Sequence, residues 1–114
     1  MAGQRMRRVN EAIREVLSEA IAEGLKDPRI GFVTVTSVDT TADLRQARVF
    51  VSVLGDDPAR EETMAGLERS RGYLQSLIGS QLSLKRTPQL TFVRDESIDY
   101  GFHIEQILKD IEQG

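Results

Sequence analysis

Cysteine is absent from this 114-residue sequence, histidine occurs once, and aromatic residues make up only 5% of it. Without cysteine the chain can form neither a disulfide nor a thiolate metal site, which fits a reducing cytosol. The single histidine, His103, excludes a site with two histidine ligands and leaves one candidate for a catalytic triad. The low aromatic content argues against a surface that stacks bases as RNA-recognition motifs do.

Other signals are missing as well. No apolar run reaches the length of a membrane span, and no apolar segment follows the basic N-terminus to form a signal peptide. Neither a Gly-x-Gly-x-x-Gly motif nor a P-loop occurs, so nucleotide binding has no support. The carboxylate pairs Asp56-Asp57 and Asp95-Glu96 stand at element ends, where turns and caps explain them. We expect a single cytoplasmic domain, monomeric, without metal, cofactor or membrane contact.

Negative charge is missing from one long stretch of the chain. Residues 69–94 contain no carboxylate but carry the basic side chains Arg69, Arg71, Lys85, Arg86 and Arg94. A second basic cluster, Arg5, Arg7 and Arg8, opens the sequence. The net charge of −3 argues against a protein that coats nucleic acid generally. It leaves room for a basic face on an acidic body.

Apolar spacing and turn residues predict the order helix, strand, strand, helix, break, helix, strand, helix. We expect a first helix over 6–25, strands over 32–39, 46–54 and 89–94, an interrupted helix over 58–82, and a short terminal helix near 104–111. Asp57 is the expected N-cap of the interrupted helix, with Pro58 at its first position. The crossover into the third strand exceeds thirty residues, long enough to make it parallel to the second.

The break in the interrupted helix is expected at Ser70-Arg71-Gly72. Apolar residues recur at helical spacing through Leu67 and again from Leu74, but the turn between them carries Ser70 and Arg71. A straight helix would push a guanidinium into the core, and Gly72 costs about 1 kcal/mol relative to alanine inside a helix. We therefore expect a sharp bend that turns Arg71 into water and starts a new helix, whose first N–H groups can bind an anion.

The predicted order resembles a type II KH domain, an α+β RNA-binding fold with a three-stranded mixed sheet. KH domains clamp the nucleic-acid backbone with a Gly-x-x-Gly loop between paired helices, but no two glycines here are three apart. Ser70-Arg71-Gly72 takes that place, and this substitution resembles the bacterial ribosome-binding factor A family, in which an Ala-x-Gly kink replaces the loop. Further motifs match in register between about Arg5 and Ile107: Arg8-Val9, Lys26-Asp27-Pro28-Arg29 with Gly31, Val33-Thr34-Val35-Thr36, Asp43-Leu44, Pro88, Leu90-x-Phe92, and Asp95-x-Ser97 with Gly101. Two positions depart from the family, because Ser70 replaces the usual alanine and Gln75 replaces a common basic residue.

The resemblance implies one KH-like RNA-binding domain over 1–114, with residues 1–5 open to disorder and 98–114 forming a helical extension. It implies a binding protein and not an enzyme. Such a factor binds the free 30S small ribosomal subunit through 16S rRNA, assists late maturation and processing of that RNA, matters most in the cold, and has other assembly factors as candidate partners. We assign RNA contact to Arg5, Arg7, Arg8, Arg45, Arg48, Arg69, Ser70, Arg71, Gly72, Lys85 and Arg86.

Plainer explanations exist for each of these residues. The break can be a corner without a ligand, the first arginines a solvated terminus, and Lys85 and Arg86 a helix cap. Arg45 and Arg48 also suit a solvated sheet face. A second function, from another class, is a protein-interaction module that docks through an uncovered sheet edge and the acidic C-terminal helix. A third is a hydrolase that depends on His103. RNA bound to the purified protein would favour binding of ribosomal RNA over the protein-interaction module.

Overall fold

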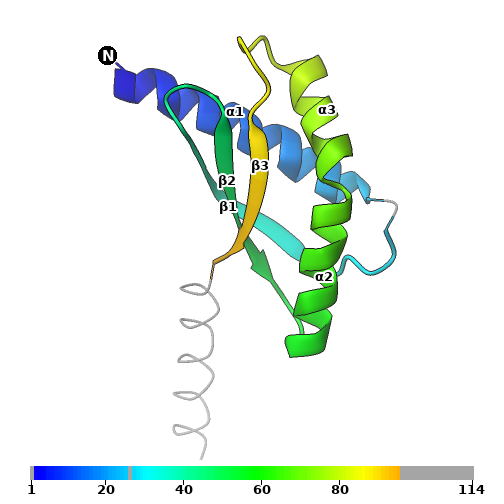
Figure 1. Ribbon diagram of the computed structural model, residues 1–114. Helices are drawn as coiled ribbons and strands as arrows, with labels where there is room; N and C mark the ends of the chain where they lie inside the picture. The colour runs from blue at the N-terminus through cyan, green and yellow to red at the C-terminus, as the bar shows by residue number, and fades with distance from the viewer. Residues whose placement is uncertain (1, 26, 96–114) are drawn as a thin grey trace, which may run out of the picture.

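The computed structural model describes residues 2–25 and 27–95, which contain three helices and three strands (Figure 1). The elements are α1 (Ala2–Glu23), β1 (Val33–Thr40), β2 (Gln46–Val53), α2 (Asp57–Arg69), α3 (Arg71–Gln81) and β3 (Gln89–Arg94). This order confirms the predicted α+β arrangement as far as β3. The predicted terminal helix over 98–114 and His103 lie outside the described residues.

The strands form one mixed sheet in the order β1, β2, β3. β1 pairs with β2 antiparallel and β2 pairs with β3 parallel, as the lengths of the two connections predict. Figure 1 shows α1 crossing behind the sheet, while α2 and α3 form one column beside β3. β2 is therefore the central strand, and β1 and β3 are the two edges.

The core lies between the sheet and the helices. All four inward side chains of β2, from Ala47 to Val53, are fully buried, as the alternation predicted. The helices contribute every third or fourth residue: Ile13, Val16, Leu17 and Ala20 from α1, Leu67 from α2, and Leu74 and Ile78 from α3. Leu90 and Phe92 of β3 complete the cluster. Helical spacing of apolar residues thus correctly predicted which face of each helix is buried.

Some predicted boundaries are wrong in detail. α1 begins at Ala2, four residues before the predicted start at residue 6. The N-cap of α2 is Asp56 and not Asp57, because a capping side chain must reach the N–H three residues on, and Asp56 Oδ1 accepts from Ala59 N–H at 3.0 Å. β1 contains a bulge between Val35 and Ser37. Because of the extra residue, the next buried side chain after Val35 is Val38, three positions later and not two, which breaks the simple alternation.

The loop between α1 and β1 packs against α2. α1 ends where Gly24 takes φ 94°, a left-handed conformation that favours glycine. Further along, Gly31 N–H donates to Thr63 Oγ1 at 3.1 Å. A Cβ on Gly66 would lie 2.5 Å from Ile30 Cγ1, so this close packing requires glycine. None of the helices in the described part of the chain is both long and apolar enough to span a membrane.

Candidate nucleic-acid interface

The helix break falls at Ser70, as predicted, but the bend is shallow. Ser70 keeps right-handed helical angles, φ −88° and ψ −2°, and α2 and α3 remain in one column (Figure 1). Its N–H donates to both Gly66 O and Leu67 O at 3.0 Å, and its carbonyl accepts from Leu74 N–H. The expected break is therefore confirmed at Ser70, but the expected sharp bend is wrong. Anion binding by the first N–H groups of α3 stays a prediction.

Arg71 turns outward at this break. Its side chain is 40% exposed and forms an ion pair with Glu68, one turn earlier, at 3.3 Å. Beside it, Gly72 is exposed and has no atom within 4 Å of the position a Cβ would occupy. A ligand can therefore approach the backbone of the first turn of α3 closely.

Three predicted arginines from distant segments meet in one cavity of about 580 Å³. Arg45 stands just before β2, Arg71 opens α3, and Arg86 lies in the loop before β3. Gln46, Gln75, Thr87 and Gln89 complete the lining, and none of the described residues in it is a carboxylate. We call this cavity the arginine pocket. A lining rich in N–H donors and free of negative charge fits an anionic ligand.

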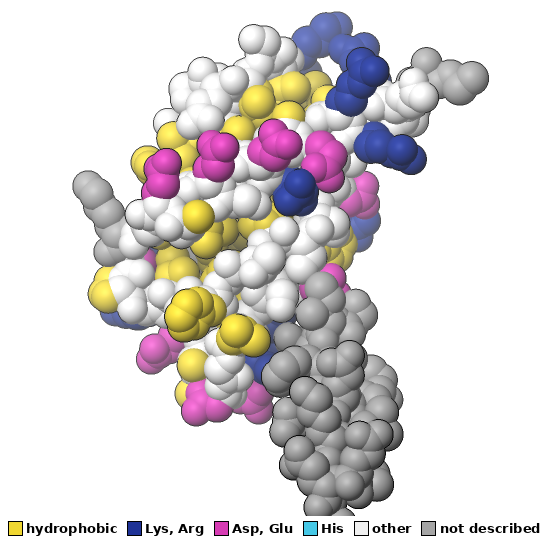
Figure 2. Space-filling view, turned by 180° about the vertical axis from the view of Figure 1, so that it is seen from behind, with side chains coloured by type: hydrophobic (Ala, Val, Ile, Leu, Met, Phe, Trp, Pro, Cys, Tyr) yellow, Lys and Arg dark blue, Asp and Glu magenta, His cyan; other side chains and the backbone are white. Residues whose placement is uncertain are grey.

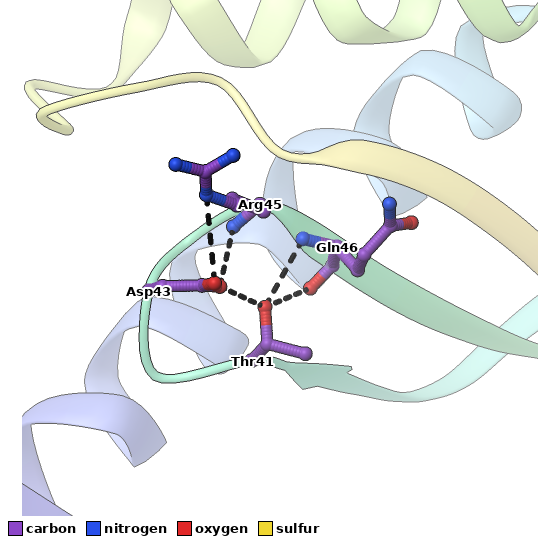
Figure 3. A network of polar contacts seen from close by, with 4 residues as sticks. All are labelled: Thr41, Asp43, Arg45 and Gln46. Atoms are coloured by element: carbon purple, nitrogen blue, oxygen red, sulfur yellow. Dashed lines mark hydrogen bonds and ion pairs between the residues drawn. The ribbon is translucent and has the colours of Figure 1, made fainter.

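A polar network in the β1–β2 turn fixes the position of Arg45 (Figure 3). Asp43 Oδ1 accepts from the Thr41 hydroxyl at 2.7 Å and from the N–H of Arg45 at 3.0 Å. Asp43 Oδ2 lies 3.6 Å from Arg45 Nε. The Thr41 hydroxyl is the main cause that lowers the pKa of Asp43, so this carboxylate stays charged at neutral pH. The Arg45 guanidinium points toward the segment that leads into β3 (Figure 3).

A second cavity adjoins the arginine pocket. It measures about 1150 Å³, and its lining includes the predicted residues Arg5, Lys85 and Arg86 together with Asp43. Arg86 lines both cavities, so the N-terminal part of α1 and the end of the α3–β3 loop extend the same surface. We call the combined surface the basic strip, which consists of Arg5, Arg45, Arg71, Lys85 and Arg86.

The other predicted residues lie away from the basic strip. Arg48 is on the outer face of the sheet, with its NH2 2.7 Å from Asp39 Oδ2 and its guanidinium 5.9 Å from the ring centroid of Phe50. Arg69 pairs with Asp27 at 2.8 Å, and Arg69 and Ser70 line a separate cavity beside Tyr73. Arg7 lines a cavity between α1 and β1, and Arg8 is exposed.

Gln75 is a pocket residue that the sequence did not identify as functional. Its Oε1 accepts from Leu90 N–H at 2.9 Å, so it joins α3 to the edge of β3. The predicted open edge at β3 is thus partly occupied by α3. The amide nitrogen of Gln75 remains a donor beside Arg71 and Arg86. In the sequence, the only signal that pointed to Gln75 was that it stands where the family commonly has a basic residue.

The ion pair between Asp27 and Arg69 predicts a dependence of stability on pH. The Arg69 side chain, and then the N–H of Arg29, lower the pKa of Asp27 below its ordinary value. A group with a lowered folded pKa stabilises the fold above its unfolded pKa, and this contribution is lost as pH falls through the folded pKa. We expect Asp27→Asn to lower the melting temperature at pH 7 and to have much less effect in acid, where the carboxylate is protonated in both the folded and the unfolded state.

Thermal denaturation at both pH values checks this expectation. Asp57→Asn is the matched control, because its side chain is 88% exposed and its nearest Arg60 nitrogen is 4.0 Å away. It should change the melting temperature little at either pH. An equal loss of stability for Asp27→Asn at pH 7 and in acid would contradict the pairing as the cause.

The fold and the surface at the helix break define a KH-like α+β domain with a basic strip in place of a Gly-x-x-Gly loop. Comparison with known proteins identifies the particular family. The family model described as "Ribosome-binding factor A" matches residues 5–108. The chain belongs to this family.

Individual relatives agree with that assignment. Ribosome-binding factor A of Geobacter sulfurreducens is 51% identical over 108 residues, which cover 95% of this chain and 92% of the relative. The factor of Brevibacillus brevis is 49% identical over 107 residues, covering 94% and 88%. A solution structure of a Thermotoga maritima protein assigned to this factor is 35% identical, with a TM-score of 0.70 over 78% of this chain and 85% of that one. A Thermus thermophilus factor, fitted into a cryo-EM map of a complex of the 30S subunit with the factor, has a TM-score of 0.63 at 24% identity, covering 76% and 91%.

Proposed function

We propose that this protein binds the small ribosomal subunit through 16S rRNA, with the basic strip on RNA phosphates. The observation that carries the proposal is the arginine pocket, in which Arg45, Arg71 and Arg86 converge with no carboxylate among the described residues of the lining. The family membership supports the choice of ligand, since the Thermus thermophilus factor was fitted into a map of its complex with the 30S subunit. The protein acts as one KH-like domain and needs no catalytic group.

The chemistry of the pocket suits a phosphate backbone. A guanidinium presents N–H donors in a planar fork that matches phosphate oxygens, and charge-assisted hydrogen bonds of this kind are stronger than neutral ones. α3 begins at Arg71, so the positive end of its helix dipole lies at the arginine pocket. Because the described residues offer few exposed aromatic rings, the strip reads RNA by charge and shape more than by stacking.

We further propose that binding assists late maturation and processing of 16S rRNA and matters most in the cold. A protein that acts by binding alone can shift a folding equilibrium by as much as it prefers one RNA arrangement over another. Non-productive RNA structures persist longer at low temperature, so the need for such a factor rises there. The measurement for this part is the ratio of precursor to mature 16S rRNA in cells that lack the protein, which should rise on cooling.

Co-sedimentation with purified subunits tests the binding itself. We expect the protein to sediment with small subunits and not with large ones. Since each phosphate contact releases counterions, association should weaken steeply with salt, by at least roughly 100-fold between about 50 and 200 mM for five phosphate contacts. Association that is insensitive to salt, or equal for the two subunits, would contradict a phosphate-reading surface.

A further inference from the structure

The outward face of α1 carries a row of acidic side chains that the proposed function does not use. Glu11, Glu15, Glu19 and Glu23 recur at intervals of four residues, which places them on one side of the helix. Figure 2 shows this row crossing the molecule, with basic side chains gathered toward the N-terminal end. Glu11 pairs with Arg14 at 2.8 Å. In the part of the chain that the structure describes, the other three make no ion pair, so their charge faces solvent.

An apolar groove runs beside this acidic row. It has a volume of about 460 Å³ and lies between the C-terminal half of α1 and the start of β1. Ile21 and Leu25 form one wall, and Ile30, Phe32 and Val33 form the other, and no charged side chain is among the described residues of the lining. In Figure 2 hydrophobic side chains line a hollow below the acidic row. Phe32 is 80% exposed, which is unusual for a phenylalanine in a small domain.

The wall formed by β1 also offers backbone hydrogen bonds. Among the described strands β1 pairs with β2 alone, so alternate N–H and C=O groups along β1 face away from the sheet. At the far end of β1, Thr40 N–H is occupied by Asn10 Oδ1 at 2.9 Å. Next to the groove, an extended peptide could pair with the strand and insert a side chain between Leu25 and Phe32.

The charge beside the groove decides between RNA and protein as the occupant. Glu15, Glu19 and Glu23 carry negative charge that repels phosphate, and none of the described residues that line the groove is basic. The same carboxylates attract lysine and arginine, while the apolar walls suit a hydrophobic anchor. We propose that this groove binds an extended, basic segment of a protein component of the small subunit, while the basic strip holds the RNA. The inference rests on the proposed function, because the partner is placed on that subunit.

Photo-crosslinking tests the inference. A benzophenone amino acid is placed at Phe32 in one protein and at Thr87 in another, since Thr87 lines the arginine pocket without carrying charge. Both proteins are bound to purified small subunits and irradiated. At Phe32 we expect an adduct that protease removes and nuclease does not, mapping to a lysine- or arginine-rich peptide. At Thr87 we expect an adduct with RNA.

The outcomes separate this inference from the proposed function. RNA crosslinked at Phe32, or no adduct at Phe32 while Thr87 crosslinks to RNA, overturns the groove and leaves the basic strip standing. If the unmodified protein does not sediment with small subunits, both the proposed function and this inference are contradicted.

Reversing the charge of two residues tests whether the acidic row is responsible for the contact at Phe32. Glu15→Lys with Glu19→Lys should lower the yield of the Phe32 adduct severalfold, because charges at the rim of an interface act mainly on the rate of association. Glu61→Lys with Glu62→Lys makes the same change of charge on exposed positions of α2 and should leave the yield unchanged. An equal fall in both variants would mean that net charge, and not the groove, controls the contact.

Discussion

Arg71→Glu combined with Arg86→Glu is expected to weaken binding to the small subunit roughly 100-fold while leaving the fold intact. Each side chain lines the arginine pocket and is partly or fully exposed, so neither change removes core packing. A hydrogen bond to a charged group contributes about 1.5 to 3 kcal/mol, and 1.4 kcal/mol corresponds to a factor of ten. Two lost contacts, and two carboxylates brought near phosphate, therefore account for a loss of this size.

Sedimentation with purified small subunits at constant salt measures the effect, and circular dichroism checks the fold. Arg48→Glu is the matched control for Arg86→Glu, because each reverses one exposed arginine but Arg48 lies on the outer face of the sheet beside Asp39. Arg48→Glu should bind nearly as well as the unaltered protein. If Arg48→Glu and Arg86→Glu weakened binding equally, net charge and not the arginine pocket would control association.

The salt dependence gives an independent readout of the same variants. A protein that has lost two phosphate contacts releases about two fewer counterions, so its slope of log K against log salt should be flatter by nearly two. The Arg48→Glu control should keep the original slope. This comparison separates a lost contact from a general change in affinity.

The fold was predictable because its signals are local in the sequence. Ala47, Val49, Val51 and Val53 alternate with polar or aromatic residues, and alternation of this kind describes a half-buried strand. The long crossover makes β3 parallel, as expected. The N-cap and the bulge were not predictable to the residue. Asp56 and Asp57 are equally good caps by type, and only the backbone decides which one reaches Ala59 N–H.

The candidate site was predictable only in part, because charge counted along the chain ignores pairing in space. Residues 69–94 contain no carboxylate, yet Arg69 pairs with Asp27, which is 42 residues away in sequence. Arg71 pairs with Glu68, which lies just outside that stretch. Conversely, Arg45 lies in a stretch of the sequence where basic and acidic residues are nearly equal in number. The β1–β2 turn nevertheless places it in the arginine pocket. The order of the strands in the sheet decides which arginines share a surface. No short stretch of the sequence carries that information.

The two ends of α1 illustrate how one helix can serve two surfaces. Arg5, near its start, extends the basic strip beside Lys85 and Arg86. The acidic row begins at Glu11 and continues to the C-terminal end. A charge gradient along one rigid helix orients the domain on a polyanion, because the basic end is attracted and the acidic end repelled. Orientation of this kind would present the apolar groove away from the RNA.

Leu74→Ala is expected to have the largest effect on stability, with a loss of about 2 to 5 kcal/mol in the free energy of unfolding. Leu74 is fully buried, and its N–H donates to the carbonyl of Ser70, the residue at the break. Without the break, the helical repeat that runs through Thr63 and Leu67 would bring Arg71 into the core. Small domains are stable by about 5 to 15 kcal/mol in total, so this one truncation can remove a large share.

Tyr73→Ala is the matched control, since it truncates the neighbouring residue of the same helix, whose side chain is 59% exposed. It should cost less than about 1 kcal/mol, because little of that side chain leaves a packed environment. Urea denaturation of both variants, with comparison of their m-values, measures the difference. Equal losses for the two variants would mean that α3 does not turn Leu74 inward.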